Sequence, residues 1–375
     1  MDKAFLARSA VERLQAVSRE TLYLHGGLDR TRPVVVQGMV TERCNYRCEY
    51  CAFGRRESTA DEISSEEWCA ALLTLREFIG PFLIQFAGGE PFVKRGFLDI
   101  LDFCHEQGIH FGLITNGSGL SERNCRRLSN ARPFNVDVSV DASRAEIHDA
   151  VRGVPGSLES IEAGVGRLLE ARRTVGAVFP VRIKTTVHRR NQGTLSDLVR
   201  WVEAIGATSV DFSPVRRWTP EVEEDLWIRD SKSLQSLERE IAELIRLKRA
   251  GAPIETSEEK LSAFVDHFED REGSLAVSPC RVGMREYHIR PNGDVKVCWY
   301  HPAIGNVRRG DARSIWHGEK ARAVRLNTVQ CELFKVHSCA HSCLGHQPIR
   351  KLVARTWMLM RHSGRGAARD ARKEG

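Results

Sequence analysis

The sequence predicts an α/β protein with a partial (β/α)6 TIM-like barrel and a small C-terminal α+β extension. Three observations predict this architecture. Strand-like and helix-like segments alternate through the first 218 residues, a charged connector then ends the alternation, and cysteines become dense after residue 279. Such alternation is typical of parallel β/α units. Six strands are too few for a closed eight-stranded barrel, so an open barrel is predicted, with a doubly wound sheet as the alternative.

The local pattern of apolar residues predicts each strand and each helix. Apolar, β-branched runs with the length of buried strands lie at 34–40, 82–87, 109–115, 134–140, 181–187 and 208–213. Segments with helical spacing lie at 64–79, 95–107, 120–130, 157–173 and 194–205. The turn sequence Pro291-Asn292-Gly293-Asp294 separates two further short strands.

Composition changes along the chain divide it into five parts. We expect an N-terminal helical segment (1–32), a barrel core (33–218), a helical connector (219–274), a cysteine-rich module (275–347) and a basic tail (348–375). Between residues 350 and 375, eight Lys or Arg residues against two acidic ones supply +6 of the net charge of +7. The excess of positive charge therefore lies in the tail, and we expect no nucleic-acid partner for the rest of the chain.

The cysteine content indicates metal binding. The chain has 11 cysteines, an odd number, and its first 30 residues are charged throughout and do not resemble an export signal. No apolar run is long enough to span a membrane. We therefore expect a cytoplasmic protein, in which clustered thiols ligate metal more often than they form disulfides.

Three cysteines follow the first predicted strand at close spacing. Cys44, Cys48 and Cys51 form a Cys-x3-Cys-x2-Cys pattern within a single loop, and no fourth cysteine is near. Short spacings of this kind allow one loop to surround a soft metal centre with thiolates. Structural zinc sites normally have four protein ligands. Three ligands therefore indicate a centre with an open coordination position for a substrate or cofactor.

This pattern, at the end of a first β-strand, resembles the radical S-adenosylmethionine (radical SAM) superfamily. The resemblance implies that the three thiolates hold a [4Fe–4S] cluster whose fourth iron binds SAM. It also implies an external electron donor of the flavodoxin or ferredoxin type and reductive cleavage of SAM to a 5′-deoxyadenosyl radical.

Other positions match SAM-contacting positions of the family. Gly88-Gly89-Glu90 follows the second strand and resembles the GGE motif, whose carboxylate suits the SAM ammonium. Tyr50, before the last cysteine, matches the position beside the adenine. The remaining matches lie after the third and fourth strands: Asn116, Ser139, Asp141 and Arg152. An arginine in this place pairs well with the SAM carboxylate.

The later cysteines resemble the SPASM and twitch modules that bind auxiliary iron–sulfur clusters in this superfamily. Cys280, Gly293 and Cys298 match the start of that pattern, and Cys339-x3-Cys343 matches a later part. Only Cys331 stands where two further cysteines are expected, so we expect one auxiliary [4Fe–4S] cluster, held by Cys280, Cys298 and two of the other three. A zinc knuckle is the structural alternative. If Cys331 is not a ligand, the resemblance suggests that it donates a hydrogen atom to a substrate radical.

These features predict a radical SAM oxidoreductase or maturase that acts on a natural-product intermediate. A small, sugar-like or cyclitol-like substrate is favoured slightly, because only about 32 residues precede the first strand. A peptide maturase with a separate leader-binding partner is the first alternative. A tRNA-modifying enzyme that uses the basic tail and a non-catalytic electron carrier are the others.

Overall fold

The computed structural model describes residues 3–55, 61–217, 220, 222–271 and 280–331. In these residues the strands form one curved sheet in the order β6-β5-β4-β3-β2-β1-β7-β8-β9. Neighbours from β6 to β7 pair in parallel, and β7-β8-β9 pair antiparallel. The strand bounds are β1 Val35–Met39, β2 Leu83–Ala87, β3 His110–Thr115, β4 Asn135–Ser139, β5 Val181–Val187, β6 Ser209–Pro214, β7 Glu286–Ile289, β8 Asp294–Lys296 and β9 Gly305–Asn306.

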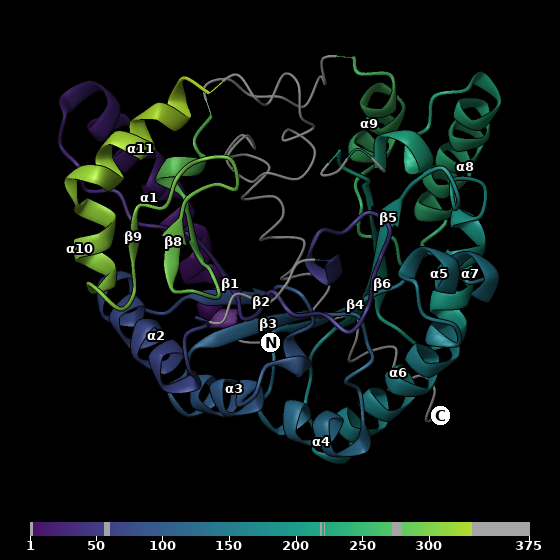
Figure 1. Ribbon diagram of the computed structural model, residues 1–375, viewed down its shortest axis with the longest axis horizontal. Coiled ribbons are helices and arrows are strands. Elements are labelled where there is room, and N and C mark those ends of the chain that lie inside the picture. Colours follow the sequence, from purple (N-terminus) through teal and green to yellow (C-terminus); the bar gives the residue numbers. More distant parts are fainter. Residues whose placement is uncertain (1–2, 56–60, 218–219, 221, 272–279, 332–375) are drawn as a thin grey trace.

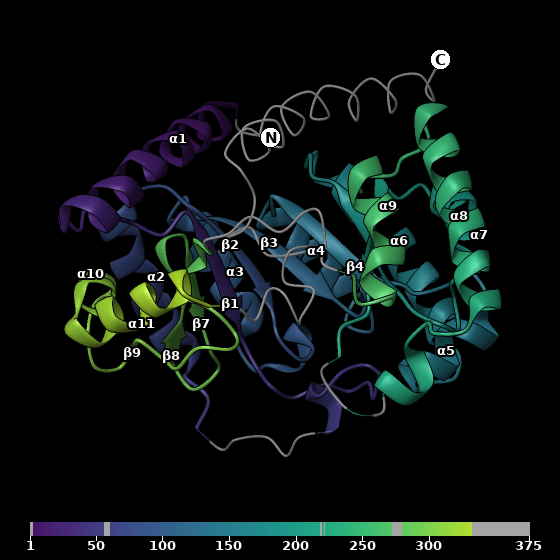
Figure 2. The same cartoon turned by 90° about the horizontal axis from the view of Figure 1, so that it is seen from above.

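Helices cover the outer, convex face of this sheet (Figure 1). Those on the convex face are α2 Ser65–Ile79, α3 Phe97–Glu106, α4 Glu122–Asn130, α6 Ser157–Thr174 and α7 Leu195–Ala204. The others are α1 Lys3–Gly26, α5 Ala145–Arg152, α8 Ser231–Arg249, α9 Glu258–Phe268, α10 Ala312–His317 and α11 Glu319–Val329. Helices α1, α10 and α11 lie at one end of the sheet, and α8 and α9 lie at the other (Figure 1 and Figure 2). In the described ranges, no helix combines the length and apolar content of a membrane span.

Apolar and polar side chains alternate along the strands, so one face of the sheet is apolar and the other is polar. On β5, Val181, Ile183 and Val187 are fully buried, whereas Arg182 and Lys184 between them are half-buried. Successive side chains of a strand point to opposite faces. The apolar set therefore packs in the core beneath the helices, and the concave face keeps charged groups.

The predicted partial barrel is confirmed. The six predicted core strands match β1 to β6 within a residue or two, and the five predicted helices match α2, α3, α4, α6 and α7. Helix α5 was not predicted, because it is short and follows β4 after a brief loop. The doubly wound alternative was wrong, since the helices that follow these strands lie on the convex face (Figure 1).

The cysteine-rich segment continues the same sheet. The two short strands predicted around Pro291 are β7 and β8, and they pair antiparallel. Strand β7 also pairs in parallel with β1, with Gln37 opposite His288. Sequence pattern did not predict this pairing, because about 245 residues separate the two strands.

A buried arginine joins α11 to the segment that precedes β1. Arg325 on α11 is fully buried and pairs with Asp29, with Nη1 3.0 Å from Oδ2. It also donates to the carbonyl oxygens of Gly283 and Trp316, and its guanidinium lies over the Trp316 ring. A buried charge without its partner is strongly destabilising. This contact therefore fixes the segment before β1 against the C-terminal helices.

Replacing Arg325 by Met should lower the free energy of unfolding by about 3–5 kcal/mol, because Asp29 then stays buried without its cation. Urea denaturation measures the change. The control is Arg126→Met, which removes an exposed ion pair with Glu122 on α4 and should cost less than about 0.5 kcal/mol. A loss for Arg325→Met as small as that of the control would contradict the assignment.

Candidate functional site

The three closely spaced cysteines lie on the wall of one cavity. The loop after β1 carries Cys44, Cys48 and Cys51, and all three line a cavity of about 250 Å³ at the C-terminal ends of the barrel strands. In β/α barrels this end of the strands builds the functional site. The cavity is therefore the candidate site.

Backbone hydrogen bonds hold the cysteine loop on two sides. On one side, the loop after β2 donates from Gly89 N to Thr41 O (2.8 Å) and from Glu90 N to Arg43 O (2.9 Å). On the other side, the cysteine loop itself donates from Arg47 N to Arg152 O (3.3 Å) and from Glu49 N to Val151 O (2.9 Å), at the end of α5. These hydrogen bonds therefore fix the main chain of the cysteine loop on both sides.

Gly88 and Gly89 are required by this contact. A Cβ on Gly89 would lie 2.0 Å from the carbonyl oxygen of Arg43, and one on Gly88 would lie 2.5 Å from that of Thr41. Gly88 also has φ of 135°, a conformation that residues with a Cβ rarely adopt. The two glycines therefore allow the β2 loop to lie directly against the cysteine loop.

Glu90 lies behind the glycines and is fully buried. Its carboxylate accepts hydrogen bonds from Thr115 Oγ1 (2.8 Å) and from the backbone nitrogens of Asn116 (2.6 Å) and Phe92 (3.2 Å). Burial nevertheless raises the pKa of Glu90 to about 7. In this arrangement the carboxylate links the end of β2 to the end of β3. Gly88, Gly89 and Asn116 line the cavity beside it.

Nitrogen donors approach the sulfur of Cys44. The Tyr46 backbone nitrogen lies 3.4 Å from Cys44 Sγ, and Asn116 Nδ2 lies 3.9 Å from it. The same amide nitrogen donates to Asn45 Oδ1 at 3.0 Å. Asn116 therefore joins the end of β3 to the cysteine loop.

A buried ion pair between Asp141 and Arg152 lies beside Cys48. Asp141 accepts from Tyr50 Oη (2.8 Å) and pairs with Arg152 Nε (2.9 Å), and Arg152 Nη1 lies 3.9 Å from Cys48 Sγ. Burial acts to raise the pKa of Asp141, but Arg152, His188 and His148 outweigh it and leave the pKa below its ordinary value. The carboxylate and the guanidinium are therefore both charged at neutral pH.

Burial also affects the thiols. It raises the pKa of Cys44, and it raises that of Cys48 to about 11 even though Arg152 acts in the opposite direction. Thiols in this state keep their protons until a metal displaces them. Metal binding by this loop should therefore release protons.

The donor set suits an iron–sulfur cluster. Three thiols of one loop line the same cavity, and cysteine thiolates are the ligands that hold such clusters. In a four-iron cluster each cysteine binds a different iron, so three cysteines leave one iron without a protein ligand.

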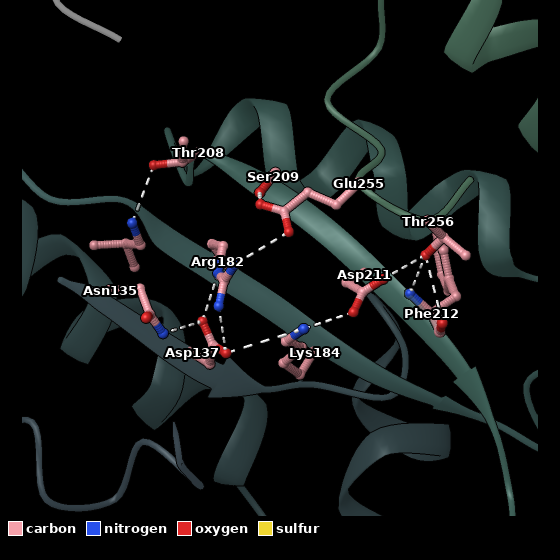
Figure 3. Close-up of polar contacts among 11 residues, drawn as sticks. Asn135, Asp137, Arg182, Lys184, Thr208, Ser209, Asp211, Phe212, Glu255 and Thr256 are labelled. Atoms are coloured by element: carbon pink, nitrogen blue, oxygen red, sulfur yellow. Dashed lines mark hydrogen bonds and ion pairs between the residues drawn. The ribbon is translucent and has the colours of Figure 1, made fainter. Parts of the chain in front are cut away.

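The cavity wall also carries an ion pair that sequence analysis missed. Lys184 on β5 and Asp211 on β6 line the cavity, with Nζ 2.5 Å from Oδ2. Figure 3 shows this pair within a network that continues through Asp137, Arg182 and Glu255 on one side and through Thr256 on the other. Charged residues at alternate positions of a buried strand, as in Arg182 and Lys184, were the available signal.

The remaining predicted positions are placed as follows. Ser139, at the end of β4, lines the cavity. Cys280 is buried before β7, Cys298 follows β8, and Cys331 follows α11 with its backbone nitrogen bonded to Thr328 O. Cys339 and Cys343 lie outside the described residues.

Comparisons with known proteins agree with this geometry. Residues 39–190 match the model of the radical SAM superfamily, and residues 280–344 match SPASM, an iron–sulfur cluster-binding domain. The AdoMet-dependent heme synthase of Nitratidesulfovibrio vulgaris is 27% identical over 327 residues, 81% of this chain and 85% of the relative. The PqqA peptide cyclase of Methylocella silvestris is 24% identical over 300 residues, 77% of this chain and 75% of the relative.

Solved structures share the fold. Streptococcus suis SuiB bound to S-adenosylmethionine superposes with a TM-score of 0.63 at 16% identity, covering 86% of this chain and 76% of SuiB. The fold, the family matches and the cysteine trio on one cavity wall lead to the same conclusion. The chain belongs to the radical SAM superfamily and is an enzyme with a C-terminal SPASM-type iron–sulfur module.

Proposed function

We propose that this radical SAM enzyme abstracts a hydrogen atom from a peptide precursor and so starts its dehydrogenation, epimerisation or crosslinking. The supporting observation is one cavity that is lined both by the three cysteines and by a Lys–Asp pair. The superfamily brings a [4Fe–4S] cluster with SAM, and the SPASM module brings auxiliary iron–sulfur clusters. When bound and reduced, the cluster and SAM supply the 5′-deoxyadenosyl radical.

In this proposal the chain's residues divide into ligands and positioning groups. Cys44, Cys48 and Cys51 ligate the cluster that binds SAM. The groups around SAM are those of the same cavity: Tyr50, Gly88, Gly89, Asn116, Ser139 and Arg152. Asp141 holds Tyr50 and Arg152 in place from behind, and Glu90 stabilises the loop that presents the two glycines.

The ion pair favours a peptide substrate. A peptide group offers one acceptor and one donor, which match the Lys184 ammonium and the Asp211 carboxylate. Burial acts to raise the pKa of Asp211, but Lys184 and Lys260 outweigh it and keep the group ionised. The relatives support the same choice, since PqqA peptide cyclase is named for a peptide and SuiB has been solved with its precursor peptide SuiA. The sugar-like substrate favoured by the sequence becomes the alternative.

The heme synthase relative supports a second candidate, an activity in heme synthesis. The basic tail, on which a tRNA substrate depends, lies outside the described residues.

The C-terminal module is proposed to hold one auxiliary cluster. Cys280 and Cys298 supply two thiolates, and two of Cys331, Cys339 and Cys343 complete the set. Strand β7, between Cys280 and Cys298, pairs with β1, which leads into the cysteine trio. This pairing supports a position for the module beside the barrel, where its cluster can exchange an electron with the substrate radical. A flavodoxin-like or ferredoxin-like donor in the cytoplasm would supply electrons.

Gly89→Ala should reduce the iron bound after anaerobic reconstitution by one cluster, about four irons per chain. The added Cβ would collide with Arg43 O and displace the cysteine loop. Gly166→Ala on α6 is the matched control, since a Cβ there meets nothing within 4 Å. Full iron content in Gly89→Ala would contradict the role given to the β2 loop.

The proposed function is tested with precursor peptides encoded beside the gene, incubated anaerobically with reduced enzyme and SAM. Mass spectrometry should show a peptide product formed together with 5′-deoxyadenosine. Turnover of a cyclitol, a tetrapyrrole or tRNA in place of every peptide would contradict the proposal.

With the peptide substrate in hand, Lys184→Met and Asp211→Asn should each raise KM for the peptide about 10- to 100-fold, the value of a charge-assisted hydrogen bond. 5′-Deoxyadenosine formation without peptide should persist in both. Glu255 belongs to the same network but does not line the cavity. The control variant Glu255→Gln should therefore leave KM nearly unchanged.

A further inference from the structure

The contact between Arg152 and Cys48 is fixed from several directions. Arg152 is buried. Its Nη1 lies 3.9 Å from Cys48 Sγ, and its guanidinium lies 5.6 Å from the centre of the Tyr50 ring. Its backbone carbonyl accepts from Arg47 N within the cysteine loop. The side chain and main chain of this residue therefore both contact the loop that carries the trio.

Asp141 fixes the opposite end of the guanidinium. One carboxylate oxygen accepts a hydrogen bond from Tyr50 Oη and lies 2.9 Å from Arg152 Nε in an ion pair, and the other oxygen accepts from the Thr186 backbone nitrogen at 3.1 Å. Asp141 is fully buried. The Arg152–Asp141 ion pair is thus buried and held in one orientation. Its positive group, the guanidinium, has a nitrogen within 4 Å of the Cys48 sulfur.

Charges in such a position act strongly on a cluster. The reduction potential of an iron–sulfur cluster depends on net charge, on hydrogen bonds to the cysteine sulfurs and on solvent exposure. A positive group beside a thiolate favours the more negative, reduced cluster, and a negative group disfavours it. Low local dielectric increases both effects.

We propose that Arg152 and Asp141 set the reduction potential of the cluster held by Cys44, Cys48 and Cys51, with Arg152 raising it and Asp141 lowering it. This role is separate from any contact of Arg152 with SAM, and it rests on the cluster-ligand role proposed for the trio. The pair then adjusts how readily an electron donor reduces the cluster before SAM is cleaved.

The test is an EPR-monitored redox titration of reconstituted full-length protein without SAM. A variant with the trio replaced by alanine is titrated in parallel, and its auxiliary-cluster signal is subtracted. Arg152→Gln should make the midpoint potential more negative, and Asp141→Asn should make it less negative. The double variant should return toward the unmodified value, and Arg152→Lys, which keeps the charge, should stay closer to that value than Arg152→Gln.

Opposite shifts distinguish this role from a structural one, because damage to packing would move both variants in the same direction or lose the cluster. Iron content measured on each sample confirms that the cluster is present. Arg182→Gln breaks a buried Arg–Asp pair between β4 and β5 that does not line the cavity, and it should leave the potential unchanged. Unchanged potentials in Arg152→Gln and Asp141→Asn, shifts of the same sign, or an equal shift in Arg182→Gln would overturn the proposal.

If the alanine variant of the trio keeps all its iron and its full EPR signal, the cluster-ligand assignment itself fails. That result is distinct from a failure of the electrostatic role, which requires a trio-dependent signal whose potential the two variants do not shift.

Discussion

The site depends on the backbone hydrogen bonds that hold the cysteine loop between the end of β2 and the end of α5. The β2 loop contributes the amides of Gly89 and Glu90, and the carbonyl groups of Val151 and Arg152 at the end of α5 accept from the other side. Two glycines make the first contact possible. Since a loop fixed in this way loses little conformational freedom on binding, the thiols are preorganised for a ligand that spans them.

Three ion pairs of the described residues lie on the concave side of the barrel. Arg152 pairs with Asp141 near the trio, Lys184 pairs with Asp211 on the cavity wall, and Arg182 pairs with Asp137 beside them. Well-packed apolar residues often stabilise a fold as well as buried ion pairs do. The charges that line the cavity, on Arg152, Lys184 and Asp211, are therefore consistent with the binding roles proposed for them.

Much of this organisation could be predicted from sequence. Strand and helix periodicity defined the core because each strand carries its own apolar pattern, and the Cys-x3-Cys-x2-Cys spacing identified the family because its chemistry needs that spacing. The pairing of β7 with β1 and the Arg325–Asp29 contact could not be predicted, since both join residues far apart in sequence. The Gly88-Gly89-Glu90 motif could be recognised in the sequence, and the structure adds that its two glycines allow the β2 loop to contact the cysteine loop. Lys184 and Asp211 were missed because they lie on two different strands, and only the pairing of β5 with β6 brings them together.

The central claim is that Cys44, Cys48 and Cys51 hold a cluster that cleaves SAM, and its most direct test is 5′-deoxyadenosine formation by anaerobically reconstituted protein with dithionite and SAM. The account predicts that the unmodified chain forms 5′-deoxyadenosine and methionine in equal amounts, that replacing the trio by alanine abolishes both, and that Cys104→Ala, a change within the α3 core, does not. No SAM cleavage by the iron-loaded chain, or unchanged cleavage without the trio, would contradict it.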